Sequence, residues 1–288
     1  MDSPTLDISD FLYPQTSSEG SNWIEYLTGC FEGSPFGCTK HLWNFAFAGA
    51  DITAALFALF NTLSVHEKLK FSRLPLHHNF TTSLVEQVNQ WTKFASRAIP
   101  HPRHKTLTVW WIGINDTGDT FKNASITNFP AFWETEMVAY FDAVQLAQTN
   151  GLDTHLFINV PAEERNPSFV GSSNAAKFKQ NIDQFNTVLA EHVQRFKNTN
   201  PDAVVMTFDS NALFNSILDS PTEFGFTNTT GFYTCADPTG FFWYNSGHPT
   251  QAVHKLIAQA IEAELRNPTF IGTSTTEFMY KETIKYDE

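Results

Sequence analysis

The sequence has 288 residues, of which 42% are hydrophobic and 17% charged, with a formal net charge of −12. The acidic charge argues against nucleic acid as a partner, because phosphate binding needs a basic face, and it also opposes an anionic membrane surface. No apolar run reaches the roughly 18 residues that span a bilayer, so we expect no membrane partner. The length is sufficient for one large globular domain.

The first part of the chain is polar and predicts irregular structure. Residues 1–22 contain Pro4 and Pro14, and the start at Met1 has neither the basic residues nor the apolar core of a signal peptide. Taken as written, the chain is expected to be cytoplasmic. A short helix is expected over residues 22–28, followed by a loop over residues 29–40.

The cysteine and sequon patterns leave the redox compartment open. Cys30 and Cys38 enclose a short loop and can pair, which would contribute about 2–3 kcal/mol and leave Cys235 over. Three unpaired thiols are the alternative. Sequons at Asn79, Asn115, Asn123 and Asn228 weakly favour a secreted protein.

Apolar periodicity predicts strands that alternate with helices along the rest of the chain. The expected strands are 41–48, 106–114, 154–160 and 203–208. The expected helices are 51–62, 81–98, 129–150, 172–197, 210–218 and 249–266. A loop is expected from 219 to 247 and a loose tail over 267–288.

The most informative strand ends at Gly113-Ile114-Asn115-Asp116. It is uncharged and rich in β-branched and aromatic residues from Thr106 to Ile114, which is typical of a strand buried on both faces of a parallel sheet. Ligands bind outside the carboxyl ends of such strands, so Asn115 and Asp116 are candidate site residues. The alternation as a whole predicts a single α/β domain over residues 1–288, with helices on both faces of a parallel sheet.

Three turn motifs follow one another in the order Asn44–Ala50, Gly113–Asp116 and His248-Pro249-Thr250. Each motif alone has an ordinary structural explanation: a glycine in a turn, an asparagine that forms or caps a turn, and a histidine at a helix start. The other histidine pairs, His77-His78 and His101 with His104, lack the spacing of a metal site, and we expect no metal.

In this order and spacing the motifs resemble the SGNH (GDSL) hydrolase superfamily, and within it the fungal acetylesterases of carbohydrate esterase family 16. The shared stretches are Tyr13–Trp23, Trp43–Ala50, Gly113–Asp116 and Phe242–Thr250. The resemblance implies a flavodoxin-like, three-layer fold and a serine esterase without a cofactor. It also implies roles for individual residues: Gly49 and Asn115 as oxyanion donors, His248 as general base, and Asp116 as a residue that holds the turn.

Two positions depart from the family pattern. The family has Asp three residues before the histidine, and this chain has Asn245, which cannot stabilise an imidazolium by charge and can favour the wrong tautomer. The family's nucleophile belongs to a Gly-Asp-Ser block after the first strand. Met1-Asp2-Ser3 is similar to this block only in its Asp and Ser, and no strand precedes it in the sequence. Ser3 is therefore either the nucleophile or an ordinary terminal residue. The simplest hypothesis is that an upstream stretch with a signal peptide, the first strand and the serine is absent.

The expected function is that of a monomeric carboxylic-ester hydrolase, acting as an acetylesterase on acetylated sugars or oligosaccharides. By resemblance it would be extracellular. Two alternatives remain open at this point: a truncated, inactive paralogue, and a lipase-like esterase on acyl lipids.

Overall fold

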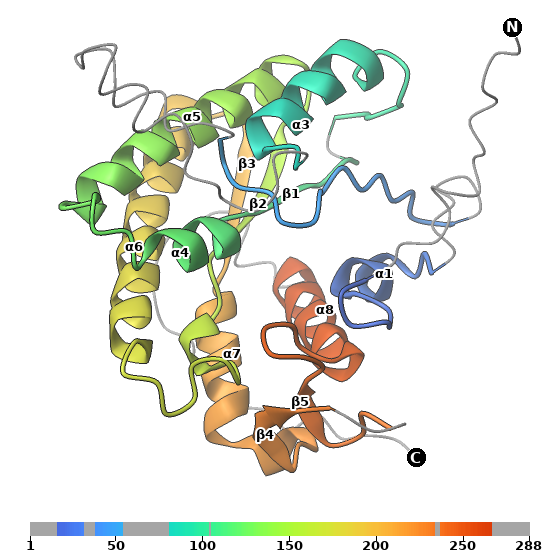
Figure 1. Cartoon of the computed structure of the whole chain (residues 1–288). Helices are drawn as coiled ribbons and strands as arrows, with labels where there is room; N and C mark the ends of the chain where they lie inside the picture. Colours follow the sequence, from blue (N-terminus) through green and yellow to red (C-terminus); the bar gives the residue numbers. More distant parts are fainter. Residues whose placement is uncertain (1–15, 32–37, 54–80, 104, 234–236, 267–288) are drawn as a thin grey trace, which may run out of the picture.

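The computed structural model describes residues 16–31, 38–53, 81–103, 105–233 and 237–266. Its centre is a parallel sheet of three strands, β1 (Thr108–Trp111), β2 (Thr154–Ile158) and β3 (Val204–Phe208), in the order β1-β2-β3 (Figure 1). Trp110 lies opposite Phe157, and Leu156 lies opposite Met206. The sheet and its flanking helices make this an α/β fold.

One face of the sheet is covered by three helices, α3 (Leu84–Gln90), α5 (Phe129–Thr149) and α6 (Ala175–Thr199) (Figure 1). The side chains of Trp110 and Phe157 stack at 6.3 Å and meet the ring of Tyr140 from α5. Trp133 and Phe185 fill the space between α5 and α6 and are fully buried. Aromatic packing therefore supplies much of this half of the core, in keeping with the 28 Phe residues of the sequence.

The opposite face packs against α1 (Trp23–Thr28), α7 (Ser210–Asp219) and α8 (Gln251–Arg266). Trp23 of α1 meets Trp111 of β1 edge-on at 5.4 Å. Leu156 and Ile158 of β2 belong to this second core, as their alternation with Phe157 requires. Helices thus cover both faces of the sheet, as the alternation of elements predicted.

The remaining elements are short. They are α4 (Ile114–Thr120), a π-helical turn (Trp91–Ala95) that continues α3, two 3₁₀ turns (Glu163–Arg165 and Pro221–Phe224), and the strands β4 (Asn228–Phe232) and β5 (Phe241–Trp243), which pair in parallel. No helix of the described ranges is both long and apolar enough to cross a membrane.

The structure corrects two predicted elements and confirms most others within a few residues. Residues 41–48 are not a strand: they are irregular, and the side chains of Trp43, Phe45 and Phe47 are partly exposed. Aromatic composition predicts a strand, but a strand also needs a neighbour to pair with, and no described strand pairs with this segment. The loop expected from 219 to 247 contains β4 and β5.

Cys30 and Cys38 form a disulfide, with their Cα atoms 5.4 Å apart. The bond closes the loop between α1 and the segment that leads to Gly49. The alternative of three free thiols is therefore wrong for this pair. Cys235, residues 54–62 of the helix expected over 51–62, and the tail over 267–288 lie outside the described residues, whereas residues 51–53 are described and are not helical.

Candidate active site

The turn after β1 presents Asn115 and Asp116 at the carboxyl edge of the sheet. Gly113 has a φ of +111°, and α4 begins directly after it, at Ile114. A Cβ atom on Gly113 would lie 2.2 Å from the ring of Phe185, so only glycine fits. Asn115 and Asp116 consequently lie in the first turn of a helix, where the sequence predicted only a sharp turn.

Two hydrogen bonds join this turn to the loop that contains Gly49. The Asn115 side-chain amide donates to the Ala50 carbonyl at 2.9 Å, and the Ile52 amide donates to the Asp116 carboxylate at 3.0 Å. Gly49 has a φ of +77° in a turn closed by a bond from the Ala50 amide to the Phe47 carbonyl. Gly49, Asn115 and Asp116 are thus brought together from segments more than 60 residues apart.

Three buried carboxyl groups lie next to the loop that contains Gly49. Asp51, Asp116 and Glu136 are each at most 5% exposed. Burial, together with the charges of Asp116, Asp119 and Glu136, raises the pKa of Asp51 to about 9. Burial and the charge of Asp116 raise the pKa of Glu136 to about 8. Asp51 and Glu136 are therefore protonated at neutral pH, which removes most of the repulsion from the cluster.

We expect this cluster to make the protein less stable as the pH rises. Because the pKa of Glu136 is raised on folding, the folded protein keeps a proton that the unfolded chain has released above about pH 5. The stabilisation is complete below about pH 4 and is lost as the pH rises through about 8, at about 1.4 kcal/mol per pH unit for each such group.

Glu136→Gln tests this pH dependence, because the amide is neutral at every pH and keeps an oxygen for the hydroxyl of Thr53. Urea unfolding between pH 5 and pH 8 should give a shallower fall in stability for this variant than for the wild type. Glu223→Gln, at an exposed glutamate, should leave the slope unchanged. Equal slopes for all three proteins would contradict the raised pKa.

His248 lies in the loop between β5 and α8, and Asn245 is its partner. The ring Nδ1 is 2.9 Å from the Asn245 Oδ1, and the His248 backbone amide donates to the same oxygen at 2.8 Å. His248 as a residue is exposed, while the atoms around its ring desolvate it enough to lower its pKa. A neutral imidazole at neutral pH is the form that accepts a proton.

The site residues expected from the sequence thus fall into two groups in the structure. Gly49, Asn115 and Asp116 form the first, and Asn245 with His248 forms the second. Ser3, the candidate nucleophile, lies outside the described residues. Within the described ranges no serine hydroxyl is hydrogen-bonded to His248.

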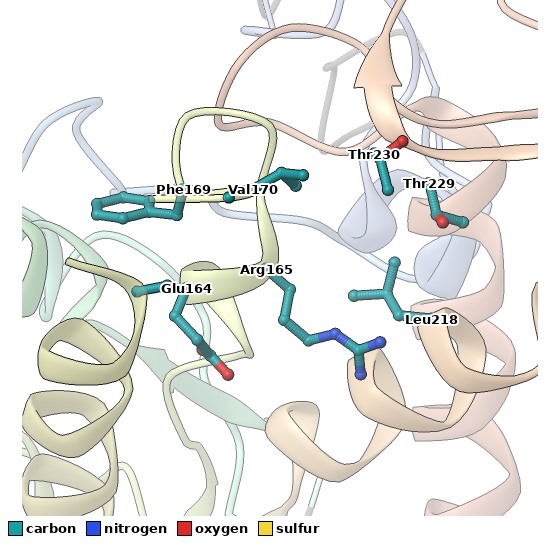
Figure 2. Close-up of a pocket in the computed structure, with 9 residues that line it drawn as sticks. Glu164, Arg165, Phe169, Val170, Leu218, Thr229 and Thr230 are labelled. Atoms are coloured by element: carbon teal, nitrogen blue, oxygen red, sulfur yellow. The ribbon is translucent and has the colours of Figure 1, made fainter. Parts of the chain in front are cut away.

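A cavity of about 250 Å³ is lined by residues of the segment 164–175, by Leu218 of α7 and by Thr229 and Thr230 of β4, and by no residue of the loop that carries His248. Its wall over residues 164–171 is joined to this loop, because the amide and hydroxyl of Ser168 both donate to the Ser246 carbonyl at 3.3 and 3.1 Å. Figure 2 shows Arg165, Val170, Leu218, Thr229 and Thr230 around the cavity. The Arg165 guanidinium is held by Asp219 at 2.7 Å and by the Asn215 side chain at 2.8 Å.

The sequence did not indicate Asp51, Glu136 or this cavity. Asp51 and Glu136 are single acidic residues in segments without a motif, and only folding brings them next to Asp116. The described part of the chain contains no group of three or more His, Cys, Asp or Glu side chains arranged to hold a metal ion.

Comparison with known proteins gives a family and two relatives of this chain. Residues 9–261 match the family described as GDSL-like lipase/acylhydrolase. The chain is 26% identical over 252 residues to an acetylesterase of Thermothelomyces thermophilus, covering 85% of this chain and 75% of the relative. It is 22% identical over 260 residues to the secreted effector protein SseJ of Salmonella typhimurium, of which it spans about half, 54%.

The family match extends over both groups of candidate residues, and the fold has the parallel sheet and covering helices that the resemblance implied. This chain belongs to the GDSL-like lipase/acylhydrolase family, whose members hydrolyse esters.

Proposed function

We propose that the protein is an acetylesterase that removes acetyl groups from sugars or oligosaccharides outside the cell. A serine hydroxyl attacks the ester carbonyl while His248 Nε2 takes its proton. The alcohol leaves with that proton, and water then releases acetate from the acyl-serine. This chemistry needs no cofactor. Within this sequence Ser3 is the candidate nucleophile that the labelling experiment below tests.

The observation that carries the proposal is the bond between the Asn115 amide and the Ala50 carbonyl. An amide NH2 has two hydrogens, and this bond uses one of them. The second hydrogen and the Gly49 backbone amide are the two donors proposed for the oxyanion of the tetrahedral intermediate. Ala50 directly follows Gly49, so the bond ties one proposed donor to the segment that carries the other.

The cavity whose wall is hydrogen-bonded to the His248 loop through Ser168 supports a substrate whose alcohol part carries hydroxyl groups. Thr229, Thr230 and Arg165 offer hydroxyl and guanidinium groups that can hydrogen-bond such an alcohol. The relative named as an acetylesterase supports a short acyl group. A panel of p-nitrophenyl esters tests the acyl part: acetate should be the best substrate, and a preference for octanoate would favour a lipid esterase instead.

Asn115→Ala should lower kcat/KM for p-nitrophenyl acetate by about 10²–10³-fold with little change in KM, because the lost donor acts on the transition state. Asn123→Ala is the matched control. The Asn123 side chain accepts a hydrogen bond from the Ser125 backbone amide, outside the candidate site, and its loss should leave the rate unchanged. A loss below about threefold for Asn115→Ala would exclude the oxyanion role. A glycan on Asn115 would exclude it as well.

The nucleophile is identified by labelling with a fluorophosphonate, which reacts with activated serines, followed by peptide mass spectrometry. A label on Ser3 that disappears in His248→Ala is the expected result. A label on another serine would replace Ser3 in the mechanism. The absence of any label, together with no hydrolysis, would support an inactive paralogue.

A further inference from the structure

The side-chain amide of Asn245 can have only one orientation. The backbone amides of Gly247 and His248 both donate to the same Asn245 atom, at 3.0 and 2.8 Å. An NH2 group cannot accept these hydrogen bonds, so the atom is the oxygen Oδ1. The assignment of Oδ1 and Nδ2 therefore follows from the two backbone N–H donors, which need an acceptor.

The nitrogen end of the Asn245 amide leads independently to the same assignment of oxygen and nitrogen. Asn245 Nδ2 lies 3.1 Å from the backbone carbonyl of Ser17, which can only accept. If the amide were reversed, its nitrogen would face two N–H groups and its oxygen would face a carbonyl. All three hydrogen bonds would then be lost.

Ser17 is held in place by the turn Thr16–Gly20. The Gly20 amide donates to the Thr16 hydroxyl at 3.1 Å and so closes the turn. A Cβ atom on Gly20 would lie 2.8 Å from the side-chain oxygen of Gln251, so the turn packs closely against the first residue of α8. The Glu19 carboxylate raises the pKa of the Tyr244 hydroxyl, which is a second interaction between the turn and the loop.

The orientation of Asn245 determines which ring nitrogen of His248 carries the proton. Nδ1 lies 2.9 Å from Oδ1, and Oδ1 can only accept, so Nδ1 must be the donor. In the neutral ring the lone pair is then on Nε2, the nitrogen that takes the proton from a serine in a triad.

We propose that Asn245, oriented by the Ser17 carbonyl, is a positioning residue that selects the productive Nδ1–H tautomer of His248. The inference rests on the proposed function. It removes one of the two objections to asparagine at this position. In serine proteases the corresponding Asp-to-Asn change lowers kcat by about 10⁴-fold because the histidine adopts the wrong tautomer. Here the tautomer is retained, and only the charge that stabilises the imidazolium is missing.

The tautomer can be measured without any assay of activity. Two-bond ¹H–¹⁵N correlation spectra of protein labelled with ¹⁵N-histidine distinguish a protonated ring nitrogen from one with a lone pair. The His248 signals are assigned by their disappearance in His248→Gln. A protonated Nδ1 and an unprotonated Nε2 at pH 8 are expected. A proton on Nε2 would overturn the proposal, whatever the esterase activity.

Asn245→Asp separates orientation from charge. The carboxylate should keep the tautomer and raise the pKa of His248 by about 1–3, since an opposite charge favours the protonated ring. The other titratable groups of the loop, the turn and α8 are the same in both proteins: Tyr244, Glu19, His254, Lys255, Glu262, Glu264 and Arg266. The acid limb of the kcat/KM profile should move to higher pH, and an unchanged limb in an active enzyme would count against the proposal.

Asn245→Ala removes the orientation and should lower kcat/KM by about 10²-fold, with rescue by Asn245→Asp. Near-UV circular dichroism confirms that each variant is folded. Loss in both variants, with an intact Nδ1–H tautomer in Asn245→Asp, would contradict the positioning role. An inactive wild-type protein with the expected tautomer would refute the proposed function and leave the tautomer assignment standing.

Discussion

His248→Ala should lower kcat/KM for p-nitrophenyl acetate by about 10²–10⁴-fold, the range expected when a general base is removed. The ring is the proton acceptor in the proposed mechanism, and its lowered pKa keeps it neutral at neutral pH. Its Nδ1 is occupied by Asn245, and no partner of Nε2 is found among the described residues. Initial rates at pH 7–8, with circular dichroism to confirm folding, provide the measurement.

The matched control is His192→Gln. His192 is a buried histidine on α6 whose ring pairs with Glu134 of α5, and the glutamine amide can still donate to that carboxylate. This variant should keep wild-type kcat/KM. Activity that survives in His248→Ala would mean that ester hydrolysis by this chain does not use the loop before α8, and the proposed mechanism would fail.

Gly113→Ala is expected to lower the free energy of unfolding by about 3–5 kcal/mol, the sum of a strained backbone and an overpacked contact. The φ of +111° is disfavoured for alanine. The added Cβ would also lie 2.2 Å from the ring of Phe185 and 2.9 Å from the side chain of Val160. Both neighbours are buried, so neither can move away without disturbing the core.

Gly171→Ala separates the two contributions. Gly171 also has a positive φ, +72°, but a Cβ there would meet no atom within 4 Å. Its loss should cost only about 1–2 kcal/mol, from the backbone conformation alone. Urea unfolding of the two variants and the wild type gives both values. Equal losses at the two positions would mean that the contact with Phe185 contributes nothing.

The fold was largely predictable from the sequence where an element carries its own periodic signal. The helix expected over 129–150 is α5 at Phe129–Thr149, and the helix expected over 172–197 is α6 at Ala175–Thr199. Residues 41–48 were mispredicted because strand formation depends on a pairing neighbour, which local composition cannot supply. β4 and β5 were missed because they are short and lie in a segment rich in Gly and Thr.

The candidate site was predictable only where it follows a motif. Gly49, Asn115 and His248 were found from turn motifs in a characteristic order. Ser17 lies in the shared stretch Tyr13–Trp23, but its contact with Asn245 was not predictable, because it is made by a backbone carbonyl that every residue has. Asp51 and Glu136 left none either, because a raised pKa results from burial and from neighbouring charges.

By itself, then, the sequence determined the class of fold and the family and supplied the candidate site residues, since these depend on local periodicity and on short motifs. Only the tertiary structure decided how the side chain of Asn245 is oriented. From the sequence, asparagine in place of aspartate predicted a weakened site and the wrong tautomer of His248. The Ser17 carbonyl, 228 residues away along the chain, orients the amide so that its oxygen faces the ring. An amide donates from its nitrogen and accepts at its oxygen, so the Ser17 carbonyl on one side of Asn245 fixes which atom faces His248 on the other.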